Sequence, residues 1–163
     1  MPSEKRALLL RALQERLVPA ILALGFDQLP LREEDRKSPE MRNGFPFGYF
    51  RRIRGTDYEL LEVQLDKGSK PQFVLNLGVV GPAGADVPWR HFEQHEAPIT
   101  ASREAYRLHP RKDPGPLGSW FTEGDAAVAL LPEAEQWFES RVVGPHMRRY
   151  GFASHSAGLA HNA

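Results

Sequence analysis

Residues Lys70–Val80 read KPQFVLNLGVV, an apolar run that is typical of a buried β-strand. Two residues interrupt the run near its middle, Asn76 and Gly78. An amide side chain and a glycine are unusual in a buried strand, because the amide needs hydrogen-bond partners and the glycine has no side chain to pack. What these two residues face is therefore the first question that the sequence raises.

Two more strand candidates precede this run, namely 45–54 and 58–65, and the third strand itself covers 72–80. The turn-forming stretches RGTD and DKGSK separate them. Short connections of this kind join consecutive antiparallel strands as hairpins. The stretch ITASREAYRLH, 99–109, is typical of a fourth strand.

The first segment, Ser3–Leu24, has the pattern of an amphipathic helix. Its apolar residues recur at spacings of three and four, at Leu9, Leu10, Leu13, Leu17, Ile21 and Leu24. Gly25 suits the left-handed position just past the helix end. Pro19 lacks a backbone donor, so we expect a kink or a break there.

Helical patterning returns in 122–152, where we expect Pro132 and Gly144–Pro145 to cut the helix. The charged segment 27–43 predicts a solvated loop. The stretch PWRHFEQHEAP predicts a single helical turn, and the small polar tail 153–163 predicts disorder. The sequence thus predicts an α+β fold within one domain, 1–152. An N-terminal helix and a C-terminal helical segment would pack on an antiparallel sheet of about four strands.

The composition narrows the classes of function. Among 163 residues, 21 basic side chains balance 21 acidic ones, which argues against a nucleic-acid partner. The absence of cysteine excludes disulfides, thiolate metal sites and a cysteine nucleophile. No signal-peptide or membrane-spanning pattern is present, and no cofactor-binding loop is recognisable. We therefore expect a cytoplasmic protein with no cofactor, no membrane partner and no nucleic-acid partner.

Side-chain alternation divides the predicted sheet into two faces. A core face would carry Phe50, Leu61, Val63, Leu65, Phe73, Leu75, Leu77 and Val79, covered by the N-terminal helix. The predicted register places Arg52 opposite Glu59, Phe50 opposite Leu61, Leu61 opposite Leu75 and Val63 opposite Phe73. The second face would then hold one row of Arg51, Leu60 and Asn76 and a second row of Tyr49, Glu62 and Val74.

This mixed second face has two interpretations. In the structural one, Arg51 pairs diagonally with Glu62, Asn76 satisfies a neighbouring backbone group, and a crossing segment lies close over Gly78. In the functional one, the face is a shallow ligand site formed by Tyr49, Arg51, Glu62 and Asn76. Arg51 would then contact an anion, Tyr49 and Asn76 would orient the ligand, and Glu62 would fix Arg51.

Several stretches together resemble a known family. These stretches are VPAILALGF, GYFRRIRG, ELLEVQ and FVLNLGVV, followed by ASREAYRLH and GSWF. Together they resemble a bacterial family that is catalogued as domain of unknown function 4304. The resemblance implies an antiparallel sheet flanked by helices and no assigned reaction.

The remaining motifs do not specify a reaction. His91 and His95 would share one side of a helix, the spacing of a zinc pair, but no third ligand is evident and we predict no metal site. Phosphate-loop, serine-nucleophile and paired-carboxylate patterns are absent as well.

Four aromatic residues in irregular segments are the candidate contacts for a protein partner: Trp89, Phe92, Trp120 and Phe121. The alternative for these residues is packing beneath loops. The sequence therefore favours a non-enzymatic protein-interaction module of an accessory or immunity type. The second hypothesis is a small-ligand-binding protein or enzyme that uses the mixed sheet face around Arg51 and Asn76.

Overall fold

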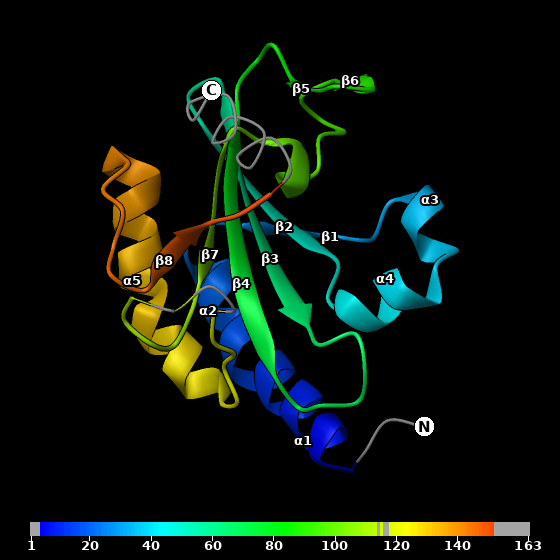
Figure 1. Ribbon diagram of the computed structural model, residues 1–163, viewed down its shortest axis with the longest axis vertical. Coiled ribbons are helices and arrows are strands. Elements are labelled where there is room, and N and C mark those ends of the chain that lie inside the picture. The colour runs from blue at the N-terminus through cyan, green and yellow to red at the C-terminus, as the bar shows by residue number, and fades with distance from the viewer. Residues whose placement is uncertain (1–3, 114, 116–117, 152–163) are drawn as a thin grey trace.

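A computed structural model, which describes residues 4–113, 115 and 118–151, contains a six-stranded antiparallel sheet with helices against it (Figure 1). The strand order is β1-β2-β3-β4-β7-β8. The strands are β1 (Asp27–Leu29), β2 (Tyr49–Arg54), β3 (Asp57–Leu65), β4 (Phe73–Val80), β7 (Glu104–Leu108) and β8 (Met147–Arg149). The predicted α+β class is confirmed, and the sheet is larger than the four strands expected.

The N-terminal helical segment continues past Pro19 without a break. It comprises α1 (Glu4–Ala12), a π-helical turn at Leu13–Leu17 and α2 (Val18–Ala23). A proline ring clashes with the carbonyl four residues earlier, and a widened turn relieves that clash. Gly25 ends the helix with φ of 95°, the left-handed conformation predicted for it.

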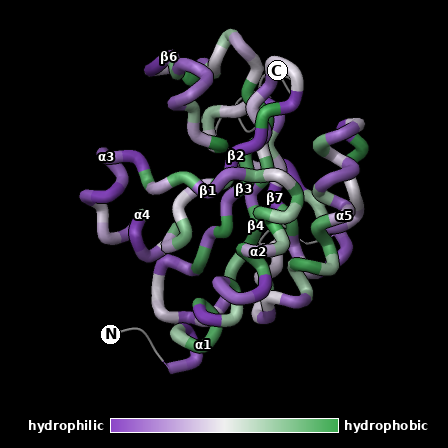
Figure 2. Tube along the Cα trace, turned by 180° about the vertical axis from the view of Figure 1, so that it is seen from behind, coloured by the Kyte–Doolittle hydropathy of each residue, from purple (hydrophilic) through white to green (hydrophobic). Residues whose placement is uncertain are grey.

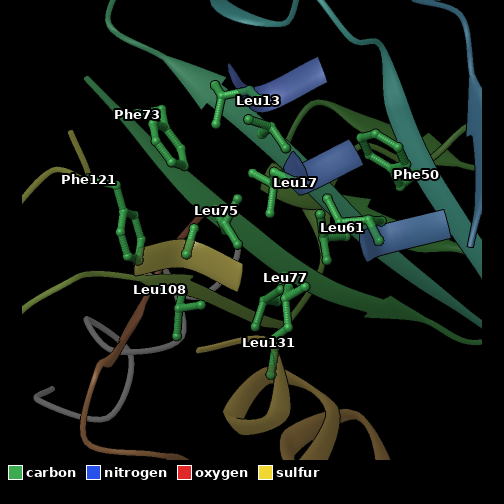
Figure 3. Packing of buried hydrophobic residues seen from close by; sticks show 14 of the residues in the cluster. Leu13, Leu17, Phe50, Leu61, Phe73, Leu75, Leu77, Leu108, Phe121 and Leu131 are labelled. Atoms are coloured by element: carbon green, nitrogen blue, oxygen red, sulfur yellow. The ribbon is translucent and has the colours of Figure 1, made fainter. Parts of the chain in front are cut away.

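The core lies between the sheet and two helical segments, the N-terminal one and α5 (Gly124–Ser140). Leu13 and Leu17 of the π-turn are fully buried and point at the sheet beside Leu75 and Phe50 (Figure 3). The predicted core face is confirmed, since seven of its eight residues are buried and Val79 packs against the same cluster. Leu131 of α5 completes this core from the other end of the sheet.

The C-terminal segment corrects two expectations. Pro132 does not cut α5, which runs through it, because the buried residues Leu131, Ala134 and Trp137 hold the helix against the sheet. Tertiary packing here outweighs the roughly 3 kcal/mol by which an internal proline disfavours a helix. Beyond Gly144–Pro145 the chain forms the edge strand β8 rather than a further helix.

The polar segment 27–43 is structured, contrary to expectation. It contains β1, α3 (Glu33–Arg36) and α4 (Pro39–Gly44), with Ser38 Oγ accepting a hydrogen bond from the Met41 amide at the start of α4. Hydrophilic residues dominate α3 in the hydropathy view (Figure 2). The charged residues of this segment form a solvated face, as expected, but they lie on a short helix rather than in a loop.

The stretch 88–98 does not begin as the predicted helical turn at Pro88, and a single hydrogen-bonded turn forms only in its second half, at 93–97. Arg90–Phe92 forms β6, which pairs with β5 (Ala85–Val87) in a separate two-stranded sheet. This hairpin lies at the end of the molecule opposite α1 (Figure 1). The chain then returns through a 3₁₀ turn, η2 (Ile99–Ala101), into β7, so the predicted fourth strand is shorter than 99–109.

The register of the first hairpin is as predicted, with Phe50 opposite Leu61 and Arg52 opposite Glu59. In the second hairpin the pairing is shifted by two residues from the prediction, so that Leu61 lies opposite Leu77. The connecting turn is wider than expected, with the Asp66 amide donating to the Gln72 carbonyl oxygen. A shift of two keeps every side chain on its predicted face but changes which residues are neighbours.

No helix in the described part of the chain is both long and apolar enough to span a membrane. The expected disordered tail, 153–163, lies outside the described residues.

Candidate functional site

The second face of the sheet carries a cavity of about 90 Å³ between β2, β3 and the segment that follows β6. Its apolar lining comes from Leu29, Pro30, Phe50, Leu60, Leu61, Ala97 and Ile99. Its polar lining comes from Arg32, Tyr49, Arg51, Glu62, Gln94 and His95. Pockets for drug-sized ligands measure roughly 300–1,000 Å³, so this cavity fits only a small molecule or one small group of a larger one.

Tyr49 is held at one side of the cavity by α3. Its hydroxyl donates to Asp35 Oδ2 at 2.7 Å, and Arg32 Nη1 lies 3.3 Å from the same oxygen. The Arg32 guanidinium also lies over the Tyr49 ring, 4.8 Å from its centroid. Burial, followed by the hydrogen bond to Asp35, raises the pKa of Tyr49, so the phenol remains protonated at physiological pH.

Glu62 is buried, with 6% of its surface exposed, although it borders the cavity. Asn76 Nδ2 donates to its Oε1 at 3.1 Å. Burial raises the pKa of Glu62 to about 7, against the weaker opposing effects of Asn76, Arg32 and Arg107. Near neutral pH this carboxyl group is therefore poised between its protonated and ionised forms.

Arg51 lies on the same face and is half-buried. Its guanidinium carbon lies 4.8 Å from the centroid of the Tyr58 ring. Within the described residues, the Arg51 side chain makes this stacking contact but no hydrogen bond and no ion pair with Glu62. The diagonal Arg51–Glu62 pair of the structural interpretation is thus not present.

Asn76 does not line the cavity but supports it from behind. It is fully buried, donates to Gln64 Oε1 at 2.9 Å as well as to Glu62, and accepts from Arg107 Nε at 2.8 Å. Arg107 also donates to Gln64 and lies 4.0 Å from the centroid of the Tyr150 ring. An amide is needed in the middle of this strand because it joins the carboxyl group of Glu62 to the half-buried guanidinium of Arg107.

Gly78 answers the second half of the opening question. A Cβ atom at this position would lie 3.2 Å from the Ile99 side chain, closer than ordinary packing allows. The absence of a side chain at Gly78 therefore lets η2 lie directly over β4. η2 is thus the crossing segment that the structural interpretation predicts at this position. Ile99 in turn forms part of the cavity wall.

The four aromatic candidates do not gather on one surface. Trp89 is 68% exposed on the β5–β6 hairpin, where Phe92 is half-buried against the small cluster around Ala85. Phe121 is fully buried, with its ring centroid 5.3 Å from that of Phe73. Trp120 is half-buried beside it in sequence. Packing beneath loops thus describes Phe121, whereas Trp89 lies at the surface.

His91 and His95 are not on one helix, because His91 belongs to β6 and His95 to the turn that follows. His91 Nδ1 lies 2.6 Å from Asp86 Oδ1, and that hydrogen bond raises the pKa of His91. Within the described residues, no group of three or more His, Cys, Asp or Glu side chains is placed to hold a metal ion.

The sequence identified Tyr49, Arg51 and Glu62, and the structure brings these three together around one cavity. It missed Arg32, Asp35, Gln94 and His95. These four residues lie in segments that lack strand or helix periodicity, so no local pattern connects them with β2 and β3. Their position depends on how those segments return to the sheet.

Comparisons with known proteins do not assign a family. No family model matches the chain, no curated protein matches it, and no solved structure matches its fold. The resemblance to domain of unknown function 4304 stays a prediction.

Proposed function

We propose that this protein binds a small ligand with an anionic group in the cavity lined by Tyr49, Arg51 and Glu62. The observation that carries the proposal is the state of Arg51. Its guanidinium borders a cavity but makes no hydrogen bond or ion pair with any described residue. Guanidinium groups recognise carboxylates and phosphates through paired N–H donors, and these donors are available here.

The surroundings of Arg51 support this function. Leu60 and Ile99 supply apolar walls that reduce competition from water, and Tyr58 holds the guanidinium plane by stacking. Tyr49 and Arg32 are already fixed by Asp35, so this side of the cavity is ordered before a ligand arrives. A preordered site loses less entropy on binding.

The test is a ligand-detected NMR screen of small carboxylates and phosphates against the intact protein, repeated with Arg51→Ala. We expect saturable binding of at least one anion and a loss of at least roughly tenfold in affinity in the variant, since an ion-paired hydrogen bond is removed. Arg54→Ala is the matched control, because Arg54 lies on the same strand but pairs with Glu59 on the other face. Binding that survives Arg51→Ala unchanged, or the absence of any binding anion, would contradict the proposal.

A second candidate is the protein-interaction module of an accessory or immunity type, and Trp89 favours it. Its side chain is 68% exposed on a hairpin at the end of the molecule (Figure 1). Exposed tryptophans are frequent anchors of protein interfaces. A pull-down from the native host should retrieve one specific protein with the unaltered chain and lose it with Trp89→Ala. Equal recovery with both chains would argue against this role for the hairpin.

A further inference from the structure

We propose that the ligand is a small zwitterion of the α-amino-acid type, whose carboxylate contacts Arg51 and whose ammonium group contacts Glu62. This inference rests on the proposed function of the cavity as a site for a small anion. It adds a second charged contact and so names the class of ligand.

The first argument concerns the free oxygen of Glu62. Asn76 donates to Oε1, and no described residue donates to Oε2. Every fully buried side-chain nitrogen or oxygen in the described residues has a hydrogen-bond partner, so Oε2 is reached by solvent. Since Glu62 is almost fully buried and lines the cavity, Oε2 faces the cavity.

The second argument is that, among the described residues, no cationic side chain forms an ion pair with Glu62. Arg32 is paired with Asp35, and Arg107 donates to Asn76 and Gln64. His95 lines the cavity but has Glu96 as its partner at 3.8 Å. The other titratable groups around Glu62 are Asp35 and the phenols of Tyr49 and Tyr150, none of which carries a positive charge. A buried carboxylate without a cationic partner is costly, and a ligand ammonium group would supply that partner.

The third argument is the placement of the two unpaired groups. Arg51 on β2 lies opposite Leu60 on β3, and Glu62 lies two residues beyond Leu60 on β3. Arg51 and Glu62 are therefore diagonal neighbours on one face of the sheet. Such neighbours have Cα atoms roughly 7–8 Å apart. Their opposite charges nevertheless do not pair, since the Arg51 guanidinium stacks on Tyr58, which lies on the other side of Leu60 from Glu62. A ligand that carries both charges on one carbon atom would bridge the space between them.

The size and lining of the cavity restrict the side chain of the ligand. About 90 Å³ leaves room for an amino acid with a small side chain, and the nearby walls at Leu60, Ala97 and Ile99 are apolar. Alanine is therefore the natural probe. Propionate lacks its amine and ethylamine lacks its carboxylate, so each of these tests one charge at nearly constant size.

The experiment is calorimetric titration of the intact protein with alanine, propionate and ethylamine at about pH 8, where Glu62 is mostly ionised. We expect alanine to bind at least roughly tenfold more tightly than either analogue, because each analogue leaves the charge of either Arg51 or Glu62 without a partner. Glu62→Gln keeps the acceptor for Asn76 but removes the charge. This variant should reduce the preference for alanine over propionate to about one.

The outcomes separate this inference from the proposed function. Equal affinities for alanine and propionate would overturn the zwitterion and leave the anion site standing. A preference for alanine that persists in Glu62→Gln would equally overturn it, since the ammonium group would then contact something else. If none of the three probes binds, the inference fails. The proposed function fails with it only if the wider anion screen is also negative.

Discussion

Glu62 shows how one buried carboxyl group makes stability depend on pH. Its pKa in the folded protein is about 7, above its ordinary value of 4.5, so between these values the folded state binds more protons than the unfolded state. Stability from this group is therefore fully present below the unfolded pKa and is lost as pH rises through the folded pKa. The loss amounts to about 3 kcal/mol in free energy of unfolding.

The Glu62→Gln variant isolates that contribution. Its amide resembles the protonated carboxyl group, so the variant should match the unaltered protein near about pH 4.5 and exceed it by up to about 3 kcal/mol near about pH 8. Urea denaturation of both proteins across this range measures the difference at each pH. A difference that does not grow with pH would show that Glu62 is not protonated in the folded protein at neutral pH.

Asn76 and Arg51 belong to the same sheet face but should differ in their effect on stability. Asn76→Ala removes one hydrogen-bond partner from each of Glu62, Gln64 and Arg107, and we expect a loss of about 2–3 kcal/mol. Arg51→Ala removes only a stacking contact and should cost about 1 kcal/mol or less. Chemical denaturation at fixed pH checks both. Equal losses would mean that Arg51 has a structural role.

At the scale of elements, Arg52 joins the end of α2 to β3 and α5. It donates to the Leu24 carbonyl oxygen, to Glu59 at 2.7 Å and to Glu135 at 2.6 Å. Its guanidinium also stacks on Phe26, 4.2 Å from the ring centroid. This residue therefore ties three elements together at one end of the core.

We expect Arg52→Ala to lower the free energy of unfolding by about 3 kcal/mol, because Glu59 is 1% exposed and loses a charged partner. Arg54→Ala is the control. Arg54 contacts the same carboxylate, but its side chain is 46% exposed, so its removal should cost about 1 kcal/mol or less. Thermal or urea unfolding of the two variants tests this ranking, and a larger loss for Arg54→Ala would refute it.

The two prolines within helices show how far the formation of a helix depends on the residues that pack against it. Pro19 is accommodated by a π-turn and Pro132 within regular α5. In each case buried neighbours such as Leu17 and Leu131 hold the helix against the sheet. Local propensity correctly marked both positions as unfavourable, but packing energy decided the outcome.

For the whole molecule, the main core connects both helical segments with the sheet in a single cluster. We therefore expect one cooperative unfolding transition, in which fluorescence from the buried Trp137 and far-ultraviolet circular dichroism change together. Trp89→Phe, at an exposed position, removes a surface contribution to the fluorescence. Two separated transitions would instead show that the domain expected over 1–152 is not one cooperative unit.

The α+β class, the core face and the first hairpin register could be read from the sequence because they follow from periodicity and short-range turns. Phe50, Leu61 and Leu75 are each followed by a polar residue, and a period of two allows one arrangement with a buried face. The second hairpin register could not be read, since the width of the turn after Leu65 depends on contacts such as the one between Asp66 and Gln72.

For the candidate site, too, some features follow from the local sequence and others only from the tertiary structure. Tyr49, Arg51 and Glu62 share a face through strand alternation, which the sequence encodes locally. Whether that face is open, which oxygen of Glu62 faces the cavity, and whether Arg51 has a partner all depend on segments that return from elsewhere, such as Arg32 and Ile99. Long-range contacts of this kind are set by the packing of the entire chain, because burial and charge pairing are properties of the assembled surroundings rather than of a residue and its neighbours in sequence.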